Sequence, residues 1–123
     1  MSPESCRAIL VIAHGSRLEE ANEDLEWLAE EIRQRCPETL VESAYLEIAD
    51  PDILTAGTRC VEQGATRVVL LPYFLSPGRH AALHLAEHRD ELSTRFPEVT
   101  FELRQPLGRH PGLVDVVIDR LSG

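Results

Sequence analysis

Two short stretches of the chain consist only of apolar residues, and they restrict the fold more than any other feature of the sequence. Residues 8–13 read Ala-Ile-Leu-Val-Ile-Ala, and residues 68–71 read Val-Val-Leu-Leu. A strand that is apolar at every position is covered on both faces, as in the centre of a parallel sheet. Residues 40–46 and 99–103 largely alternate between apolar and polar side chains, which predicts strands at the edges of the same sheet.

Helical patterns separate the four strands. A first helix is expected directly after Ser16, which forms a capping box with Glu19. A second helix is expected with Asp50 as its N-cap and Pro51 in its first turn. Gly64 supplies the residue that ends the second helix.

A third helix is expected over about residues 79–96 and a fourth over about residues 112–121. The buried face of the fourth helix is predicted to consist of Leu113, Val114, Val117, Ile118 and Leu121. The alternation of strands and helices predicts a three-layer αβα sandwich of the flavodoxin-like type, with a parallel sheet in the strand order 2-1-3-4.

Length and charge limit what the protein can do. A chain of 123 residues suits one domain, expected to span residues 1–123. The 21 acidic residues outnumber the 12 basic ones, giving a net charge of −9, and every basic residue is arginine. An acidic protein repels nucleic acid and anionic lipid, so neither is an expected partner. The apolar run at residues 8–13 is shorter than the roughly 20 residues of a membrane span, and we expect a cytoplasmic protein.

The three cysteines, Cys6, Cys36 and Cys60, have no CxxC spacing. They are therefore expected to be thiols rather than a disulfide framework or a thiolate zinc site.

Residues that can bind a metal ion follow three neighbouring strands. His14 ends the first strand, Glu47 ends the second, and His80 follows the loop that leaves the third. In an open parallel sheet, ligands bind at the carboxyl ends of the strands where the strand order reverses, and adjacent strands lie about 4.8 Å apart. Two imidazoles and a carboxylate suit Fe, Co, Ni or Zn, and three protein ligands leave coordination positions open for exchange.

The segments around these residues resemble the small sirohydrochlorin cobaltochelatases and ferrochelatases, the CbiX/SirB-like class II chelatases. The resemblance covers nearly the whole chain and rests on Ala13-His14-Gly15-Ser16-Arg17, Tyr45-Leu46-Glu47 with Asp50-Pro51, Leu71-Pro72-Tyr73-Phe74-Leu75 with Gly78-Arg79-His80, and Leu107-Gly108-Arg109-His110-Pro111.

The resemblance implies the chelatase fold, insertion of a divalent metal ion into sirohydrochlorin, and a homodimer. It also implies metal coordination by His14 and His80 with a contribution from Glu47. The metal ion is a substrate, Co²⁺ first with Fe²⁺ and Ni²⁺ as alternatives, and no organic cofactor is expected. The sequence departs from the family at His84, because the family usually has an acidic residue four positions after the second metal histidine.

Insertion requires the removal of two pyrrole N–H protons, a task that suits a neutral imidazole. Either His14 or His80 is the expected proton acceptor. Sirohydrochlorin carries several carboxylates, and the arginines beside these histidines, Arg17 and Arg79, are expected to hold them. The backbone amides of Gly15 and Ser16 are further candidates for substrate binding, and Tyr73 and Phe74 for walls around the macrocycle.

Other functions remain open from the residues alone. His14-Gly15 followed by Arg17 is compatible with a phosphohistidine enzyme, and the three candidate ligands would equally serve a metal carrier. A receiver-like signalling module needs an aspartate after the third strand, where Pro72 stands. His80, His84 and His88 recur every four residues, which predicts either a second metal site or, with more weight, one stripe of a packed helix.

Overall fold

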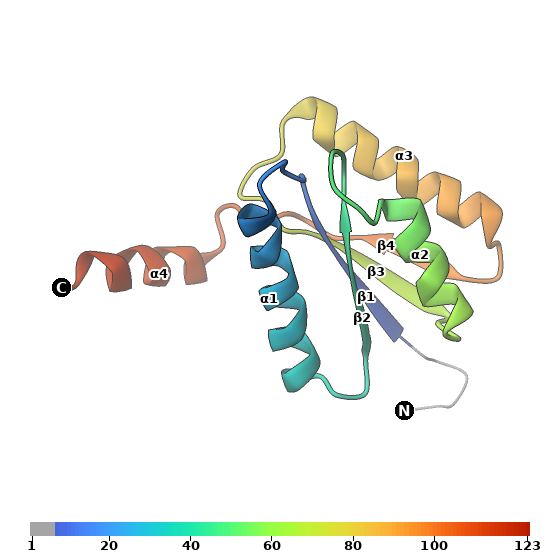
Figure 1. The fold of residues 1–123 in the computed structure, drawn as a ribbon, viewed down its shortest axis with the longest axis horizontal. Coiled ribbons are helices and arrows are strands. Elements are labelled where there is room, and N and C mark those ends of the chain that lie inside the picture. Colours follow the sequence, from blue (N-terminus) through green and yellow to red (C-terminus); the bar gives the residue numbers. More distant parts are fainter. Residues whose placement is uncertain (1–6) are drawn as a thin grey trace.

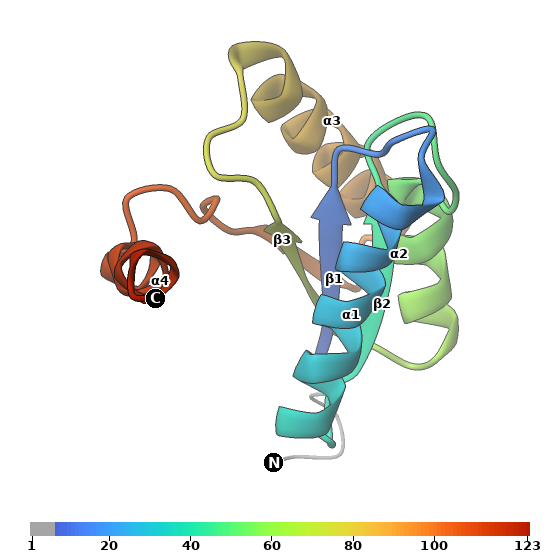
Figure 2. The same cartoon turned by 60° about the vertical axis from the view of Figure 1, so that its left-hand side comes forward.

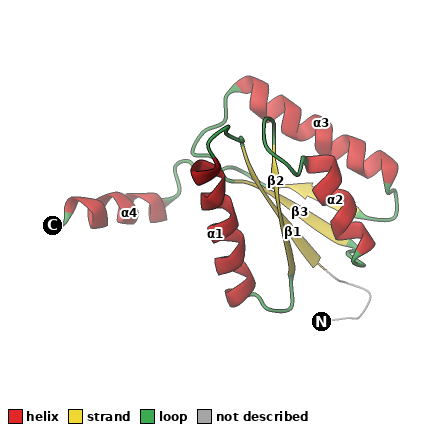
Figure 3. Cartoon of the chain, viewed as in Figure 1, coloured by secondary structure: helices red, strands yellow, loops and turns green. Residues whose placement is uncertain are grey.

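The computed structural model describes residues 7–123 of the chain and contains four strands and four helices in strict alternation (Figures 1 and 3). In chain order they are β1 (Arg7–Ala13), α1 (Glu19–Arg35), β2 (Leu40–Tyr45), α2 (Ile53–Glu62), β3 (Arg67–Pro72), α3 (Arg79–Arg95), β4 (Thr100–Leu103) and α4 (Pro111–Leu121).

The strands form one parallel sheet in the order β2-β1-β3-β4, which confirms the predicted topology. The two fully apolar segments are the central strands β1 and β3. Val11 of β1 lies opposite Ser43 of β2 on one side and Leu71 of β3 on the other. All three carboxyl ends that carry the candidate residues therefore meet at the same edge of the sheet.

Helices cover both faces of the sheet, as expected for a three-layer fold. Helices α2 and α3 pack together on one face, and α1 lies on the other (Figure 2). The core under α2 and α3 includes Leu10, Ile12 and Leu70, none of which is accessible to solvent. On the opposite face, α1 packs on β1 and β2 through Leu25 and Ala29.

The fourth helix differs from its prediction. α4 extends away from the sheet and has no buried residue (Figure 1). Leu113 is half-buried, and the other large aliphatic side chains are exposed, from 51% at Val116 to 75% at Leu121. The segment before it explains this direction. The Arg104 amide donates to the Leu70 carbonyl oxygen at 2.9 Å, and the Leu107 amide donates to that of Phe74 at 2.9 Å. These bonds hold residues 104–107 along the end of β3 and lead the chain outward.

Two helix starts also differ from their predictions. Helix α1 begins at Glu19 rather than directly after Ser16, and no side chain caps it. Helix α2 begins at Ile53, and its capping side chain is Asp52, which accepts a hydrogen bond from the Thr55 amide at 2.8 Å. The preceding Pro51 cannot start the helix because its carbonyl oxygen accepts a hydrogen bond from the Tyr45 amide, in continuation of the sheet.

The end of α2 and two of the three cysteines can be placed within the described part of the chain. Gly64 follows α2 with a φ of 98°, the left-handed conformation that glycine adopts at helix ends. Cys60 is buried and Cys36 is half-buried, whereas Cys6 lies outside the described residues. Between residues 7 and 123, no helix has the length and apolar character needed to span a membrane.

Candidate functional site

The ends of strands β1 and β2 bring His14 and Glu47 into direct contact. Nε2 of His14 lies 2.6 Å from Oε1 of Glu47, close enough for a hydrogen bond from the imidazole to the carboxylate. Both side chains are more than half exposed, at 53% and 58%. An ion pair this accessible to water contributes about 0–1 kcal/mol to stability. The pair is therefore accessible to a ligand and is of little use as a structural bridge.

Backbone contacts hold together the loop that follows β1 and the loop that follows β2. The Glu47 amide donates to the His14 carbonyl oxygen at 3.0 Å, which extends the β1–β2 pairing past the ends of the strands. Gly15 follows with a φ of 104°, and a Cβ at this position would stand 1.8 Å from the Glu47 carbonyl oxygen. Only glycine fits both requirements. Gly15 was predicted as a substrate-binding residue, and its structural task is to let the two loops approach each other.

Glu47 is followed by a strained turn. The Ala49 amide donates to the Glu47 carbonyl oxygen at 2.8 Å, and Ile48 between them has a φ of 72°. This geometry is a γ-turn of the rare, strained kind, and it is uncommon for a β-branched residue. Strain of this sort is concentrated at functional sites.

The loop after His14 is held by a residue that the sequence interpretation did not include. Asn22 of α1 accepts a hydrogen bond from the Ser16 amide at 3.0 Å and donates to the Ser16 carbonyl oxygen at 2.9 Å. The sequence had suggested that the Ser16 amide binds an anionic substrate. In the structure this amide is instead engaged within the chain. Tyr45 donates its hydroxyl to the Asn22 carbonyl oxygen at 2.8 Å. Burial, together with the nearby carboxylate of Glu26, raises the pKa of Tyr45, so the hydroxyl remains a donor.

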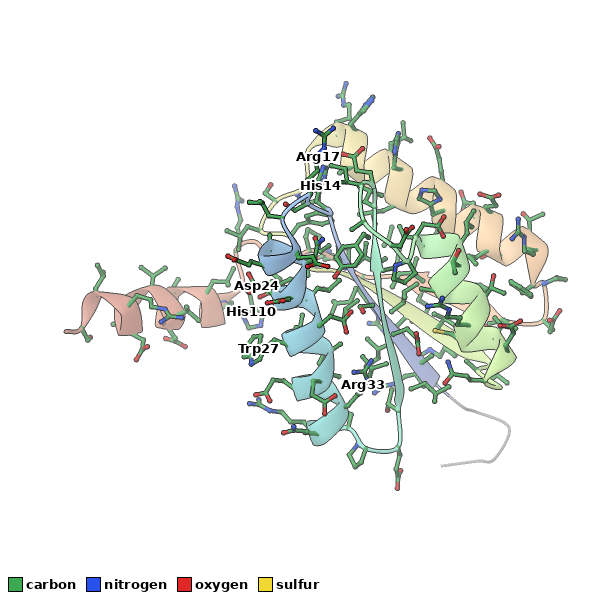
Figure 4. All side chains as sticks on the ribbon, viewed as in Figure 1. His14, Arg17, Asp24, Trp27, Arg33 and His110 are labelled. Carbon is green, nitrogen blue, oxygen red and sulfur yellow. The ribbon has the colours of Figure 1, made fainter. Side chains whose placement is uncertain are left out.

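Arg17 and Arg79, the two arginines beside the candidate histidines, are both exposed. Arg17 extends from the same loop as His14 at the carboxyl end of the sheet (Figure 4). Its position leaves the guanidinium accessible to a charged ligand. An asparagine three residues into a helix is a weak sequence signal, which is why Asn22 was missed and the arginines were not.

His80 is not part of the His14–Glu47 contact. It lies in the first turn of α3, and its ring stacks near that of His84, with 5.3 Å between ring centroids. Over residues 7–123, no three side chains of the His, Cys, Asp or Glu type are placed closely enough to hold a metal ion. The predicted meeting of three ligands is therefore present only for His14 and Glu47. The loop between β3 and α3 carries His80 past the end of its strand, a displacement that spacing along the sequence does not reveal.

The described residues also provide no three-ligand site for the histidine stripe on α3. The rings of His84 and His88 are 6.5 Å apart and perpendicular, and His88 is half-buried while His84 is exposed. This arrangement agrees with the prediction of one stripe on a packed helix.

Apolar side chains lie on the same strand-end loops as the exposed pair and on the loop after β3. The Phe74 ring meets the His14 ring edge-on, with 6.3 Å between centroids. Each of the three strand-end loops also exposes one large aliphatic residue: Leu18 at 71%, Ile48 at 60% and Leu75 at 65%. A polar pair within an apolar margin suits a ligand that is flat and apolar in its centre.

The pair can exchange its direct contact for a shared ion. Bonds from a first-row divalent metal to nitrogen and oxygen are about 2.1 Å long, so two ligand atoms on one ion lie roughly 3 Å apart. His14 and Glu47 would separate by only a few tenths of an ångström to admit one. As both side chains are exposed, this adjustment requires no change in the core.

Known proteins resemble the chain over nearly its whole length. The family model described as CbiX matches residues 8–123. The chloroplastic sirohydrochlorin ferrochelatase of Arabidopsis thaliana is 38% identical over 93% of this chain and 51% of its own length. The sirohydrochlorin cobaltochelatase of Methanocaldococcus jannaschii is 31% identical over 94% of this chain and 98% of its own.

A solved structure agrees with this relationship. The sirohydrochlorin chelatase SirB from Bacillus subtilis subspecies spizizenii, determined in complex with cobalt, superposes with a TM-score of 0.86 at 28% identity. The match covers 94% of this chain and 50% of SirB. The chain thus spans about half the length of SirB and of the Arabidopsis relative.

Proposed function

The chain belongs to the CbiX family, and on this basis we propose that it inserts a divalent metal ion, Co²⁺ first, into sirohydrochlorin. The observation that carries the proposal is the exposed His14–Glu47 contact at the carboxyl end of the sheet. Relatives named as ferrochelatases and as cobaltochelatases both match the chain. Co²⁺ stands first because the relative of similar length, that of Methanocaldococcus jannaschii, carries the cobaltochelatase name.

His14 is the proposed proton acceptor and metal ligand. Nε2 of His14 faces the Glu47 carboxylate at 2.6 Å, and a neutral imidazole with its proton on Nε2 has its lone pair on Nδ1, where it can accept a pyrrole proton. While His14 is neutral, the Glu47 carboxylate would help to hold the ion and offset its charge. Once the ion has passed to the ring and His14 has taken up the proton, the same carboxylate would stabilise the imidazolium. His80 is proposed as a second metal ligand and base that approaches when the substrate is bound, because it stands exposed at the start of α3.

The substrate is proposed to lie across the apolar margin, with Phe74 and Ile48 against its ring. Its carboxylates would pair with Arg17 and Arg79, which are exposed on the flanking loops. Arginine suits this task because its guanidinium binds a carboxylate through two parallel hydrogen bonds. Gly15 and Ser16 would act by shaping the loop rather than by donating amides.

Two copies of the chain are proposed to act together, with residues 1–123 of each forming one domain. The support is the family resemblance, which implies a homodimer, and the Methanocaldococcus jannaschii relative, which is matched over 98% of its own length. The cytoplasmic location expected from the sequence stays a prediction, since the Arabidopsis relative is named as chloroplastic.

The test is to mix the protein with sirohydrochlorin and Co²⁺, Fe²⁺ or Ni²⁺ in turn and to follow the change in absorbance. We expect faster insertion than in the absence of protein. His14→Ala and Glu47→Gln should each reduce the rate by about 100-fold or more, the scale of losing a general base. His80→Ala should reduce it as well.

Matched controls are available. His88→Gln changes a histidine two turns further along α3 than His80, and Glu62→Gln changes a glutamate at the end of α2; both variants should keep the wild-type rate. Equal rates with and without protein would refute the proposal. Tight metal binding without faster insertion would identify a carrier instead.

A further inference from the structure

Two histidines of α3, His80 and His84, hold their rings next to each other on the exposed side of the helix. They are one helical turn apart, and their ring centroids lie 5.3 Å apart with the ring planes tilted by 31°. Both residues are exposed. Within residues 7–123, neither imidazole forms a hydrogen bond or an ion pair with another residue, so both rings are accessible to a ligand.

The spacing of these rings is the one that two ligands of a shared metal ion need. Residues four positions apart on a helix face the same side with about 5–6 Å between their Cβ atoms, and two histidines at this spacing bind zinc in helical metal sites. Bonds of about 2.1 Å from one ion to two imidazole nitrogens place the ring centroids roughly 5 Å apart. Rotation of two exposed side chains therefore suffices to bring both rings onto one ion.

The backbone that carries the two rings is held in place by the core. Leu85, directly after His84, is buried in the core on this face of the sheet. At the start of the helix, the Ala82 amide donates to the Gly78 carbonyl oxygen at 3.0 Å, which closes the first turn around His80. Because the helix fixes the relative position of the two ligands before the ion arrives, binding has a small entropic cost.

The next pair along the helix is less suited to a metal ion. His84 and His88 have the same sequence spacing, but their ring centroids are 6.5 Å apart and their planes are perpendicular. His88 is also half-buried, which restricts the rotation that would bring its ring onto an ion. The geometry therefore favours His80 and His84.

The chemistry of the ligands, rather than local charge, selects the ion. Arg79 and the positive end of the α3 dipole disfavour a cation, but at an exposed helix end this effect is small and is screened by salt. The net charge of −9 attracts cations to the chain as a whole. Two imidazoles prefer late first-row divalent ions such as Co²⁺, Ni²⁺ and Zn²⁺ over Mg²⁺ and Ca²⁺.

The histidine pair is separate from the contact between His14 and Glu47. Figure 2 shows the start of α3 at the carboxyl end of the sheet but away from the loop that follows β1. In the described part of the chain no three side chains share a metal site, so an ion on His80 and His84 is not held by His14 or Glu47 as well. Two protein ligands leave most coordination positions to water, which suits an ion that is passed on.

We propose that His80 and His84 form a two-imidazole site that captures a late first-row divalent ion before it is inserted. Binding of the ion does not depend on the proposed reaction, whereas delivery from this site rests on the proposed function. His80 belongs to both steps. It holds the captured ion together with His84, and it exchanges His84 for His14 as the second ligand when the substrate is bound.

The first test measures the binding of Co²⁺ alone, by calorimetry of the full chain without an affinity tag. The parent variant is His14→Ala/Glu47→Gln, which lacks the other candidate ligands. We expect the parent to bind one ion per chain. Addition of His84→Ala should weaken binding by about 10-fold or more, since even the outer-shell partners of a metal ligand contribute about 10- to 100-fold. No binding by the parent, or binding that His84→Ala leaves unchanged, would overturn the proposal.

Two controls in the same parent separate the geometry of the site from the number of histidines. His88→Ala removes a histidine one turn beyond His84 and should leave the affinity unchanged. Addition of Ala82→His to the His84→Ala variant restores the number of histidines, but residues two positions apart on a helix do not face each other. This variant should bind as weakly as His84→Ala. Loss of binding in His88→Ala, or recovery with Ala82→His, would contradict the assignment to His80 and His84.

Delivery is tested by metal insertion into sirohydrochlorin at limiting Co²⁺, with His84→Ala in the otherwise unchanged chain. The Co²⁺ concentration that gives half the maximal rate should rise by about 10-fold, following the loss of binding, while the rate at saturating Co²⁺ stays close to that of the wild type. An unchanged dependence on Co²⁺ would overturn the delivery role. Absence of insertion by the wild-type chain would refute the proposed reaction and delivery with it, whereas the calorimetric result decides by itself whether the metal site exists.

Discussion

The face of the sheet under α2 and α3 is closed, whereas the face under α1 is covered only over β1 and β2. Leu10, Ile12 and Leu70 on the closed face are inaccessible to solvent, but Ile9 and Leu71 on the other face remain half-buried. The strained Ile48 and the exposed His14–Glu47 pair stand at the carboxyl rim of the sheet rather than in its core. This difference indicates that the closed face supplies most of the folding stability, while the open face and the rim remain available for partners and ligands.

Two neighbouring leucines of β3, which point to opposite faces of the sheet, allow the stability of the two faces to be compared by mutation. Leu70→Ala removes a fully buried side chain and should lower the free energy of unfolding by about 3 kcal/mol. Leu71→Ala removes a half-buried one and should cost about 1 kcal/mol at dilutions where the chain is a monomer. Urea unfolding measures both values. Equal losses would contradict the difference between the faces.

A substitution at Gly15 tests whether the contact between the loops after β1 and β2 is needed for stability and for metal insertion. Gly15→Ala forces a Cβ against the Glu47 carbonyl oxygen in a left-handed backbone, so the two loops must separate. We expect a loss of about 1–3 kcal/mol in the free energy of unfolding and a loss of metal insertion. Gly78→Ala is the control, since nothing lies within 4 Å of its Cβ, and it should leave both quantities nearly unchanged. A Gly15→Ala variant with wild-type activity would show that the loop contact is not needed.

Asp52 contributes to the closed face as the cap of α2. The hydrogen bond from the Thr55 amide lowers the pKa of Asp52 below its ordinary value of 3.8, and the positive charge of a protonated His88 nearby adds to this effect. Because the folded-state pKa is the lower one, the carboxylate stabilises the fold fully above the ordinary pKa and loses this effect as the pH falls through the folded-state value. Asp52→Ala should cost about 1 kcal/mol at neutral pH.

The matched variant for this effect is Asp52→Asn, which keeps a capping oxygen that does not titrate. The stability of the wild type should fall relative to that of Asp52→Asn below about pH 4, measured by thermal unfolding across a pH series. A constant difference between the two proteins would remove the assigned cause of the pKa shift.

Substitutions at Ile48 should weaken substrate binding without lowering the free energy of unfolding. Ile48→Gly relieves a left-handed backbone strain of about 1 kcal/mol and should leave the free energy of unfolding unchanged or slightly higher. Ile48→Ala keeps the strain and should not stabilise. Both variants remove an exposed aliphatic group from the proposed substrate margin, so both should raise KM for sirohydrochlorin. An unchanged KM would exclude Ile48 from substrate binding.

Much of the fold was predictable because its signals are local. The apolar runs at residues 8–13 and 68–71 identified the central strands, and the end of each strand placed His14 and Glu47 at the same rim. The start of α1 was wrong because the Ser16 side chain accepts a hydrogen bond from the Leu18 amide, which closes a turn rather than caps a helix. The two hydrogen bonds between Asn22 and the Ser16 backbone depend on where that turn places Ser16. The spacing of residues along the sequence does not predict this position.

The sequence by itself determined the strand order and the chemistry at the rim, since hydrophobic patterns specify which side chains must be covered. Only the tertiary structure decided what covers them. The apolar face of α4 predicts burial without naming the surface, and the hydrogen bonds of residues 104–107 direct this helix away from its own sheet. The position of His80 was decided in the same way, because the path of the loop, and not the number of residues in it, determines where a side chain ends.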